Sequence, residues 1–430
     1  EAMWRLPRSK LAIASAGVSK SCPALAGRRR ASGGFPLRAG GPRIRSRTLR
    51  NGLRGPSLCF GAISDVQYAC MEDSYNFDQT VVRRHRNALQ CFRTAITEWS
   101  EEPRLDFVAD LGDEIDQNSS KSPHSALATL QKEWARLLVP SHRLLGNHEL
   151  QCFARSELEQ LFPSLDVHYH SFPAAPGWRV IQLDAFDLNM IERGGGPGVE
   201  EAISFLSQYN HNDLRAPRNR RRLTDYRRGL EGLQQRFVPM GGAVREEQLA
   251  WLRGEMLAAK AASERVIVLT HVPLLPAATV PEALLWNHDE VLDILRREGQ
   301  GTVALVLAGH YHAGGYGVDE ETGTHHVTLP SPLHADLEDL RAHCLIEGWE
   351  DRLEISGAGL VPSRSLLLPQ LHRDRHVLMR RIRTLDLASA IRKGSQESAS
   401  ATDIGCMRSD ASYRTSQMKS LEFAEHVPRA

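Results

Sequence analysis

Seven side chains of metal-binding type occur at five places in the sequence, first carboxylates and amides and then imidazoles. They are Asp65, Gln67, Asp113, Asn147, His271, His310 and His312. Mixed sets of Asp, Asn and His suit Mn²⁺, Fe²⁺ and Zn²⁺, whereas a thiolate-type zinc site would need cysteines. Seven candidates are too many for one ion. If one Asp bridges, they suffice for two ions roughly 3.5–4 Å apart, which is the spacing used in phosphoryl-transfer sites.

Such an ion pair would bind a phosphate oxygen, generate a hydroxide near neutral pH and stabilise the charge that develops in the transition state. Each residue alone has an ordinary explanation. Asp65 could cap a helix or turn, His271 could be a hydrogen-bonded loop histidine, and Gly146-Asn147-His148 could be a plain turn. The prediction depends on the combination, since independent caps have no reason to occur in this order.

The elements that would position these residues alternate between short apolar runs and amphipathic segments, which predicts an α/β fold. Strands are expected at Leu58–Ser64, Asp106–Leu111, His142–Leu145, Arg179–Leu183, Arg265–Thr270 and Thr302–Ala308, and helices at Arg84–Ser100, around 127–138 and at Glu246–Ala259. The metal-type residues follow five of these strands. Because the carboxyl ends of parallel strands meet at one crevice, we expect the seven side chains to lie together.

The composition is that of a soluble globular protein, with 41% hydrophobic and 24% charged residues in 430. The net charge of +1 argues against a nucleic-acid binder, and no apolar run reaches the ~18 residues of a membrane span. The seven cysteines are scattered and form no CxxC pair, which indicates a reducing compartment.

The two ends of the chain differ from its middle. Residues 2–64 contain thirteen Lys or Arg and no acid, so segment 1–56 is either a plastid or mitochondrial transit peptide, a disordered basic tail or upstream sequence; without a transit peptide we expect a cytosolic protein. We place one catalytic domain at 57–360. Within it, 194–232 is expected to be an exposed insertion, and its basic run 218–222 to be a solvated loop. Residues 361–430 are expected to be a tail of low order.

The order D-x-[HQ], GD-x-x-D, GNH[ED], H and GH-x-H resembles the calcineurin-like metallophosphoesterase superfamily over about 58–359. The resemblance implies an α/β/β/α sandwich with a dinuclear metal site at the carboxyl ends of the strands. It also implies that Asp65, Gln67, Asp113 and His312 hold one ion, and that Asp113, Asn147, His271 and His310 hold the other. His148 would act on the leaving oxygen, while Asp116 and Glu149 would orient the metal-binding residues.

Gln67 departs from the superfamily, where His is usual. A neutral amide oxygen is a poorer zinc ligand than imidazole and is more compatible with Mn²⁺ or Mg²⁺. With the runs FGAISDVQYA, SYNF, LLGNHEL and GHYHAGGYGVD, this departure resembles the manganese-dependent ADP-ribose/CDP-alcohol diphosphatases of plants and algae. That family hydrolyses the pyrophosphate of ADP-ribose and CDP-choline-type molecules to a nucleoside monophosphate and a phosphorylated partner. Phe77 matches an aromatic near the nucleotide base, although it could equally be ordinary core.

The resemblance therefore implies two divalent ions, most readily Mn²⁺ with Mg²⁺, Fe²⁺ or Zn²⁺ as alternatives, and a small nucleoside diphosphate substrate. From the charge and the apolar runs we expect neither a nucleic-acid nor a membrane partner, and the sequence leaves the oligomeric state open, a monomer included. Two rival functions remain: a phosphomonoesterase or cyclic-nucleotide phosphodiesterase on the same scaffold, and a non-catalytic metal-binding scaffold protein. The complete set of seven ligand candidates together with His148 counts against the second rival.

Overall fold

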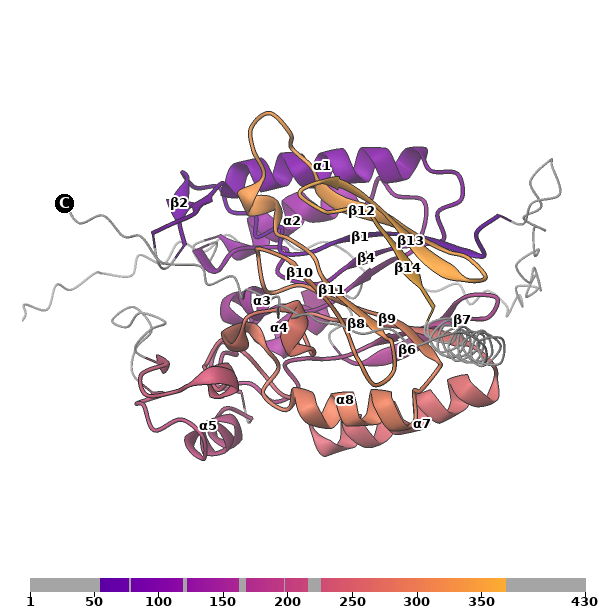
Figure 1. Cartoon of the computed structure of the whole chain (residues 1–430). Helices are drawn as coiled ribbons and strands as arrows, with labels where there is room; N and C mark the ends of the chain where they lie inside the picture. The colour runs from indigo at the N-terminus through magenta and orange to yellow at the C-terminus, as the bar shows by residue number, and fades with distance from the viewer. Residues whose placement is uncertain are drawn as a thin grey trace, which may run out of the picture. The chain divides into compact units, whose positions relative to one another are not determined.

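Two six-stranded sheets lie between two layers of helices in the computed structural model, which describes residues 55–76, 79–118, 122–161, 168–196, 198–215 and 226–368. Figure 1 shows α1 and α2 on one side of the paired sheets and α7 and α8 on the other. The helices are α1 (His85–Glu101), α2 (Pro123–Trp134), α3 (Asn147–Cys152), α4 (Arg155–Leu161), α5 (Val199–Ser207), α7 (Glu246–Ala261) and α8 (His288–Arg297), with the short 3₁₀ helices η3 (Gly232–Arg236), η4 (Pro276–Ala278), η5 (Pro281–Ala283) and η6 (Pro332–His334).

The first sheet has the order β14-β13-β12-β1-β4-β5. Its strands are β1 (Leu58–Ile63), β4 (Phe107–Asp110), β5 (Ser141–Arg143), β12 (Ala342–Gly348), β13 (Arg352–Gly359) and β14 (Arg364–Leu367). Strands β1, β4 and β5 are parallel to one another, and β12 joins β1 in antiparallel register. The three parallel strands therefore end at the same edge of the sheet.

The second sheet has the order β10-β11-β9-β8-β7-β6. It contains β6 (His170–Ala175), β7 (Trp178–Gln182), β8 (Arg265–Thr270), β9 (Val303–Ala308), β10 (Gly315–Val318) and β11 (His325–Thr328). Strands β7, β8, β9 and β11 run parallel. A separate hairpin of β2 (Ser74–Tyr75) and β3 (Val82–Arg83) precedes α1.

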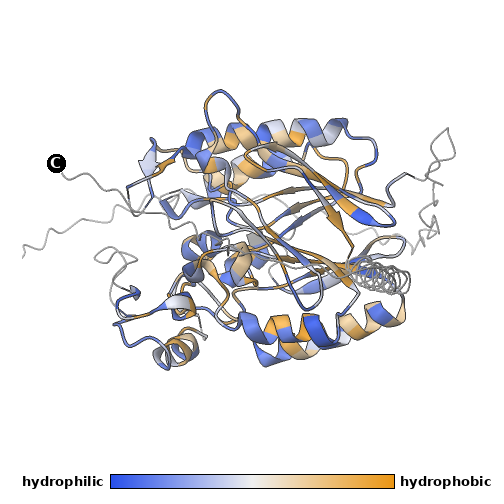
Figure 2. Ribbon diagram, viewed as in Figure 1, coloured by the Kyte–Doolittle hydropathy of each residue, from blue (hydrophilic) through white to orange (hydrophobic). Residues whose placement is uncertain are grey.

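Alternation of side chains along each strand builds one core between the sheets and another beneath the helices. Phe60 of β1 and Leu269 of β8 belong to the cluster between the sheets. Ile63 and Val268 belong to the cluster that packs the helices onto the sheets. Figure 2 shows the hydrophobic residues gathered on the strands between the helical layers. Burial on both faces explains why these strands are continuously apolar in the sequence.

The predicted α/β/β/α sandwich is confirmed, and most predicted elements differ from the observed ones by one or two residues. The largest shift is at α2, which is Pro123–Trp134 rather than about 127–138, so the expected face residue Leu138 lies beyond the helix and is exposed. Strand β5 is Ser141–Arg143 rather than His142–Leu145. The first sheet also continues beyond the predicted domain end at 360, because β14 pairs with β13 and buries Leu366. Five cysteines lie in the described part of the chain, and all are free. Within the same residues, no helix is long and apolar enough to cross a membrane.

The predicted insertion at 194–232 begins with α5, which packs through Ala202 and Leu206 onto a small cluster with Phe237 and Trp286. Phe205 of α5 stacks on Trp286 with ring centroids 5.9 Å apart. The basic run 218–222 lies outside the described residues, as do segment 1–54 and residues 369–430.

Candidate metal centre

The two sheets supply candidate metal ligands of different chemistry to one place. The first sheet contributes the carboxylates and amides that follow β1, β4 and β5: Asp65, Gln67, Asp113 and Asn147. The second sheet contributes the imidazoles that follow β8 and β9: His271, His310 and His312. The predicted convergence of five strand ends is thus present in the structure.

The backbone at four of these residues is in the left-handed region. Asp65, Gln67, Asp113 and His310 have φ angles of 53°, 44°, 59° and 66°. Such conformations cost of order 1–3 kcal/mol for residues other than glycine and persist where the surrounding structure enforces them. Hydrogen bonds between loops provide that enforcement: Asp65 N–H donates to Gly112 O at 3.0 Å, and Gln67 N–H to Asp113 O at 2.8 Å.

Asp113 lies between two groups of candidate ligands. On one side, its Oδ2 is 3.5 Å from His271 Nε2, and ligand atoms of Asp113, His271 and His310 all lie within 4.8 Å of one another. On the other side, Gln67 Nε2 is 3.0 Å from the same Oδ2 and 2.9 Å from His312 Nε2. This arrangement suits a carboxylate shared by two ions.

Asp65 completes the group that contains Gln67 and His312. His312 Nε2 lies 3.5 Å from Asp65 Oδ1. The other oxygen, Asp65 Oδ2, accepts hydrogen bonds from the Ser64 hydroxyl and from His310 N–H, at 2.9 Å for the latter. The protein thereby holds one oxygen of the carboxylate and leaves the second facing His312.

Other candidate ligands are also fixed through one atom by hydrogen bonds from the protein, while a second atom faces the cluster. Asp113 Oδ1 accepts from His148 N–H at 2.8 Å, and His271 Nδ1 donates to Leu111 O at 2.7 Å. Among the seven candidate ligands, four buried atoms have no hydrogen-bond partner in the described part of the chain: Asp65 Oδ1, Gln67 Oε1, Asn147 Oδ1 and His271 Nε2. Buried polar atoms almost always have partners, so these four fit metal coordination. For Gln67, a half-turn of the carboxamide exchanges its nearly isosteric oxygen and nitrogen.

The charged groups in this cluster shift one another's pKa values. Burial alone would raise the pKa of Asp113, but His148 and His271 hold it well below its usual range. Burial alone would lower the pKa of His271, but Asp113 raises it to about 9. Burial and the neighbouring His271 lower the pKa of His310 to about 3. A cation bound at His271 must therefore displace a proton, which makes its affinity dependent on pH.

His148 stands beside Asp113 with a defined ring orientation. The Gln117 N–H donates to His148 Nδ1 at 2.8 Å, and Asp116 Oδ2 lies 3.4 Å from the same nitrogen. The other ring nitrogen, Nε2, is 3.8 Å from Asp113 Oδ2. In the neutral ring the proton therefore resides on Nε2, which is the nitrogen nearer to the metal-type ligands.

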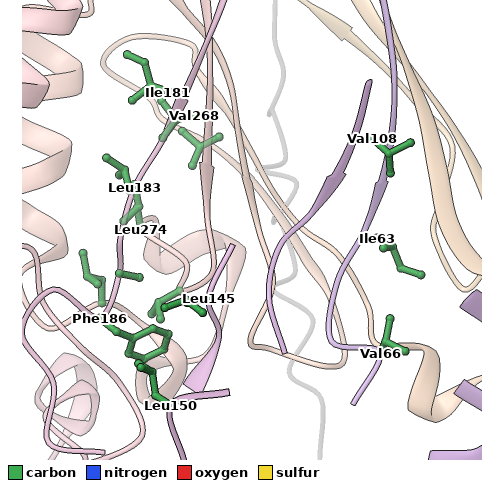
Figure 3. Close-up of a cluster of buried hydrophobic side chains, with 14 of the residues drawn as sticks. Ile63, Val66, Val108, Leu145, Leu150, Ile181, Leu183, Phe186, Val268 and Leu274 are labelled. Atoms are coloured by element: carbon green, nitrogen blue, oxygen red, sulfur yellow. The ribbon is translucent and has the colours of Figure 1, made fainter. Parts of the chain in front are cut away.

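Glu149 lies completely buried beneath the loops that carry the ligands. Its carboxylate accepts hydrogen bonds from the N–H groups of Asp113, Ile115 and Gly146 at 3.0–3.1 Å. Hydrophobic contacts also hold the segment that carries Asn147 and His148. Figure 3 shows Leu145 and Leu150, which flank Asn147 and His148 in the sequence, beside Phe186. The phenyl ring of Phe186 in turn lies 5.7 Å from the His271 ring.

Three features of the site were not predicted from the sequence. His85 donates from Nδ1 to Gln67 O at 3.0 Å. Arg83 of β3 is close enough for electrostatic interaction with the carboxylates of Asp116, Asp65 and Asp113, which oppose the lowering of its pKa by burial. The third feature is a buried ion pair between Arg143 of β5 and Glu114. Two signals were available in the sequence, because Arg83 directly precedes the predicted helix Arg84–Ser100 and His85 is the second residue of that helix. The predicted substrate residue Phe77 lies outside the described residues.

Comparison with known proteins agrees with this geometry. No protein-family model matches the chain. The chain is 33% identical to a manganese-dependent ADP-ribose/CDP-alcohol diphosphatase from Danio rerio, over 72% of this chain and 98% of that protein. It is 35% identical to the protein of the same name from Arabidopsis thaliana, over 66% of this chain and 89% of that protein.

A solved structure shares the fold. The crystal structure of a dimetal phosphatase from Danio rerio matches with a TM-score of 0.65 and 33% identity, over 73% of this chain and 99% of that one. Nearly the full length of these relatives is therefore represented here. The chain belongs to the family of manganese-dependent ADP-ribose/CDP-alcohol diphosphatases.

Proposed function

We propose that the chain is a Mn²⁺-dependent hydrolase that cleaves the pyrophosphate bond of ADP-ribose and CDP-alcohols, releasing a nucleoside monophosphate and a phosphorylated partner. The observation that carries this proposal is the position of Asp113 between two groups of ligands whose unpartnered atoms are buried. The names of the relatives give the substrate class.

The metal-binding roles follow from the grouping of the side chains. Asp65, Gln67, Asp113 and His312 would hold one ion, and Asp113 would share the second with Asn147, His271 and His310. Two bound divalent ions supply electrostatic stabilisation of phosphoryl oxygens and activation of water.

His148 is proposed as the residue that acts on the leaving phosphate. Its Nδ1 is occupied by the Gln117 N–H, so its Nε2–H is available to an oxygen of the substrate. The carboxylate of Asp116, 3.4 Å from Nδ1, would stabilise positive charge on the ring while that proton is shared. Glu149 fixes the backbone on both sides of the site and thereby the distance between Asp113 and His148.

Mn²⁺ is favoured over Zn²⁺ by the ligand set of the first ion. Gln67 brings a neutral amide in place of an imidazole, and amide oxygen suits Mn²⁺ and Mg²⁺ better than Zn²⁺. Only one imidazole, that of His312, would remain on that ion.

The test is a panel of four substrates with Mn²⁺: ADP-ribose, CDP-choline, a cyclic nucleotide and p-nitrophenyl phosphate. We expect nucleoside monophosphate from the first two as the dominant reaction. Asp113→Ala should abolish it while the protein still folds, whereas Asp351→Ala, at a half-exposed carboxylate on the surface, should not change it. Preference for the last two substrates would indicate a phosphodiesterase or phosphomonoesterase. Absence of all hydrolysis with metal bound would indicate a non-catalytic scaffold.

A further inference from the structure

His85 is a deeply buried histidine with hydrogen bonds on both ring nitrogens. It is the first residue of α1 and is 1% exposed. Its Nδ1 lies 3.0 Å from Gln67 O, and its Nε2 lies 3.0 Å from the Ser74 hydroxyl. We propose that His85 is a positioning residue that holds Gln67 in its metal-binding conformation and so sets the affinity of the centre for Mn²⁺.

The two contacts define which nitrogen carries the proton. A backbone carbonyl can only accept, so Nδ1 of His85 must donate to Gln67 O. In the neutral ring Nε2 is then the acceptor, and the hydroxyl of Ser74 donates to it. The Gln67 carbonyl thus selects the tautomer, and the Ser74 hydroxyl, which can donate or accept, holds the ring in that orientation.

Gln67 needs such support because its conformation is unfavourable. Its φ of 44° lies in the left-handed region, where a residue with a side chain is strained. The peptide N–H of Gln67 is held by Asp113 O at 2.8 Å, and its carbonyl is held by His85. Loss of the second bond would leave a buried carbonyl unpartnered, at a cost of about 1–3 kcal/mol. Rotation of the backbone would relieve that loss, but it would also move the Gln67 side chain.

The same histidine connects the metal ligand to the neighbouring hairpin. Ser74 belongs to β2 and lies directly opposite Arg83 of β3 in the hairpin. His85 Nδ1 also lies 3.9 Å from Asp116 Oδ2, the carboxylate beside His148. A change at His85 is therefore expected to reach the ligand side chain and the groups proposed to act on the substrate.

The experiment measures Mn²⁺ binding directly. Full-length protein, depleted of metal with a chelator, is titrated with Mn²⁺ while free Mn²⁺ is followed by electron paramagnetic resonance. We expect His85→Phe to weaken one of the two sites by about 10- to 100-fold, the usual effect of losing a residue that orients a metal ligand. His85→Asn should recover most of the affinity, because its amide nitrogen is attached at the same position as Nδ1. His85→Gln, whose amide extends toward the position of Nε2, should not.

Two further variants separate positioning from general destabilisation. Ser74→Ala removes only the partner of Nε2 and should weaken Mn²⁺ binding by a few-fold. His343→Asn alters a histidine of similar burial, 3% exposed, whose Nε2 contacts Glu98 at 2.9 Å. It should lower thermal stability without changing Mn²⁺ affinity.

The role of His85 rests on the proposed two-metal site, and the titration distinguishes failure of that role from failure of the two-metal site. Wild-type protein that binds fewer than two Mn²⁺ ions would overturn the proposed function. Wild-type protein that binds two ions, together with His85→Phe or His85→Gln binding them equally tightly, would overturn only the role of His85. A loss of affinity in His85→Asn as large as in His85→Phe would also contradict it.

Discussion

Replacement of Gly146 by Ala should inactivate the enzyme through a single added methyl group. Gly146 precedes Asn147 with φ −103° and ψ 178°, which alanine adopts freely, so the backbone itself would not be strained. An added Cβ would lie 2.0 Å from Asp113 Oδ1 and 2.4 Å from Asp113 N. Ordinary contact begins at 3.4 Å, so the carboxylate oxygen would have to separate from it by about 1.4 Å (3.4 − 2.0).

The expected loss of activity follows from the size of that displacement. A misplacement of about 1 Å at a reacting centre can reduce the rate about 100-fold. Gly146→Ala should therefore lower kcat/KM for ADP-ribose at saturating Mn²⁺ by at least about 100-fold, or about 2.7 kcal/mol in transition-state stabilisation. The methyl group also overfills a packed site, so the free energy of unfolding should fall by about 1–3 kcal/mol.

The assay is steady-state release of AMP, with Gly254→Ala as the matched control. Gly254 lies within α7, and an added Cβ there meets no atom within 4 Å. The control should keep full activity and gain up to about 1 kcal/mol of stability. Gly146→Ala with near-normal kcat/KM and undiminished Mn²⁺ affinity would refute the assignment of Asp113 as the shared ligand.

Three further predictions address the metal, a buried ion pair and acid stability. Wild-type activity should be higher with Mn²⁺ than with the same concentration of Zn²⁺ or Mg²⁺, and Gln67→His should shift the metal preference toward Zn²⁺. The same order of activity with the three metals in both proteins would contradict this. Arg143→Met, which leaves the buried Glu114 unpaired, should lower the free energy of unfolding in urea by about 3–5 kcal/mol, and the double variant with Glu114→Leu should recover most of the loss. Burial lowers the pKa of His326 to about 3, so between about pH 6.5 and 3 the unfolded chain binds a proton that the folded chain does not. Stability should fall as the pH falls through that window, by up to about 1.4 kcal/mol per pH unit, and His326→Gln should flatten this part of the curve.

The elements that could be predicted from the sequence are those whose residue types indicate the secondary structure by themselves. The run Arg265–Thr270 is β-branched and apolar, and β8 has the predicted bounds. The convergence of the metal-type side chains could be predicted because parallel strand ends meet at one edge of a sheet. The end of β5 was predicted two residues too late, because the apolar residues Leu144 and Leu145 continue the strand pattern toward the ligand loop.

The missed features depend on contacts between distant segments. His85 bonds to residues 18 and 11 positions earlier, so its role depends on the path of the first loop and the hairpin. Arg143 and Glu114 are 29 positions apart, and either residue alone suggests only a solvated charge. The glycine at 146 is readable as a turn residue, but its close approach to Asp113 arises only when the two loops pack together.

The division of ligands between the sheets has a mechanical consequence. The candidate oxygen ligands come from one sheet and the imidazoles from the other, while the faces of the sheets otherwise meet through apolar side chains. Bound ions would therefore cross-link the two halves of the sandwich, with the shared carboxylate of Asp113 at the junction. Sliding of one half over the other would stretch coordination bonds, so ion occupancy and the relative motion of the halves are thermodynamically linked. Metal-loaded protein should accordingly exchange the amide hydrogens of β1 and β8 more slowly than metal-depleted protein, with both halves responding together.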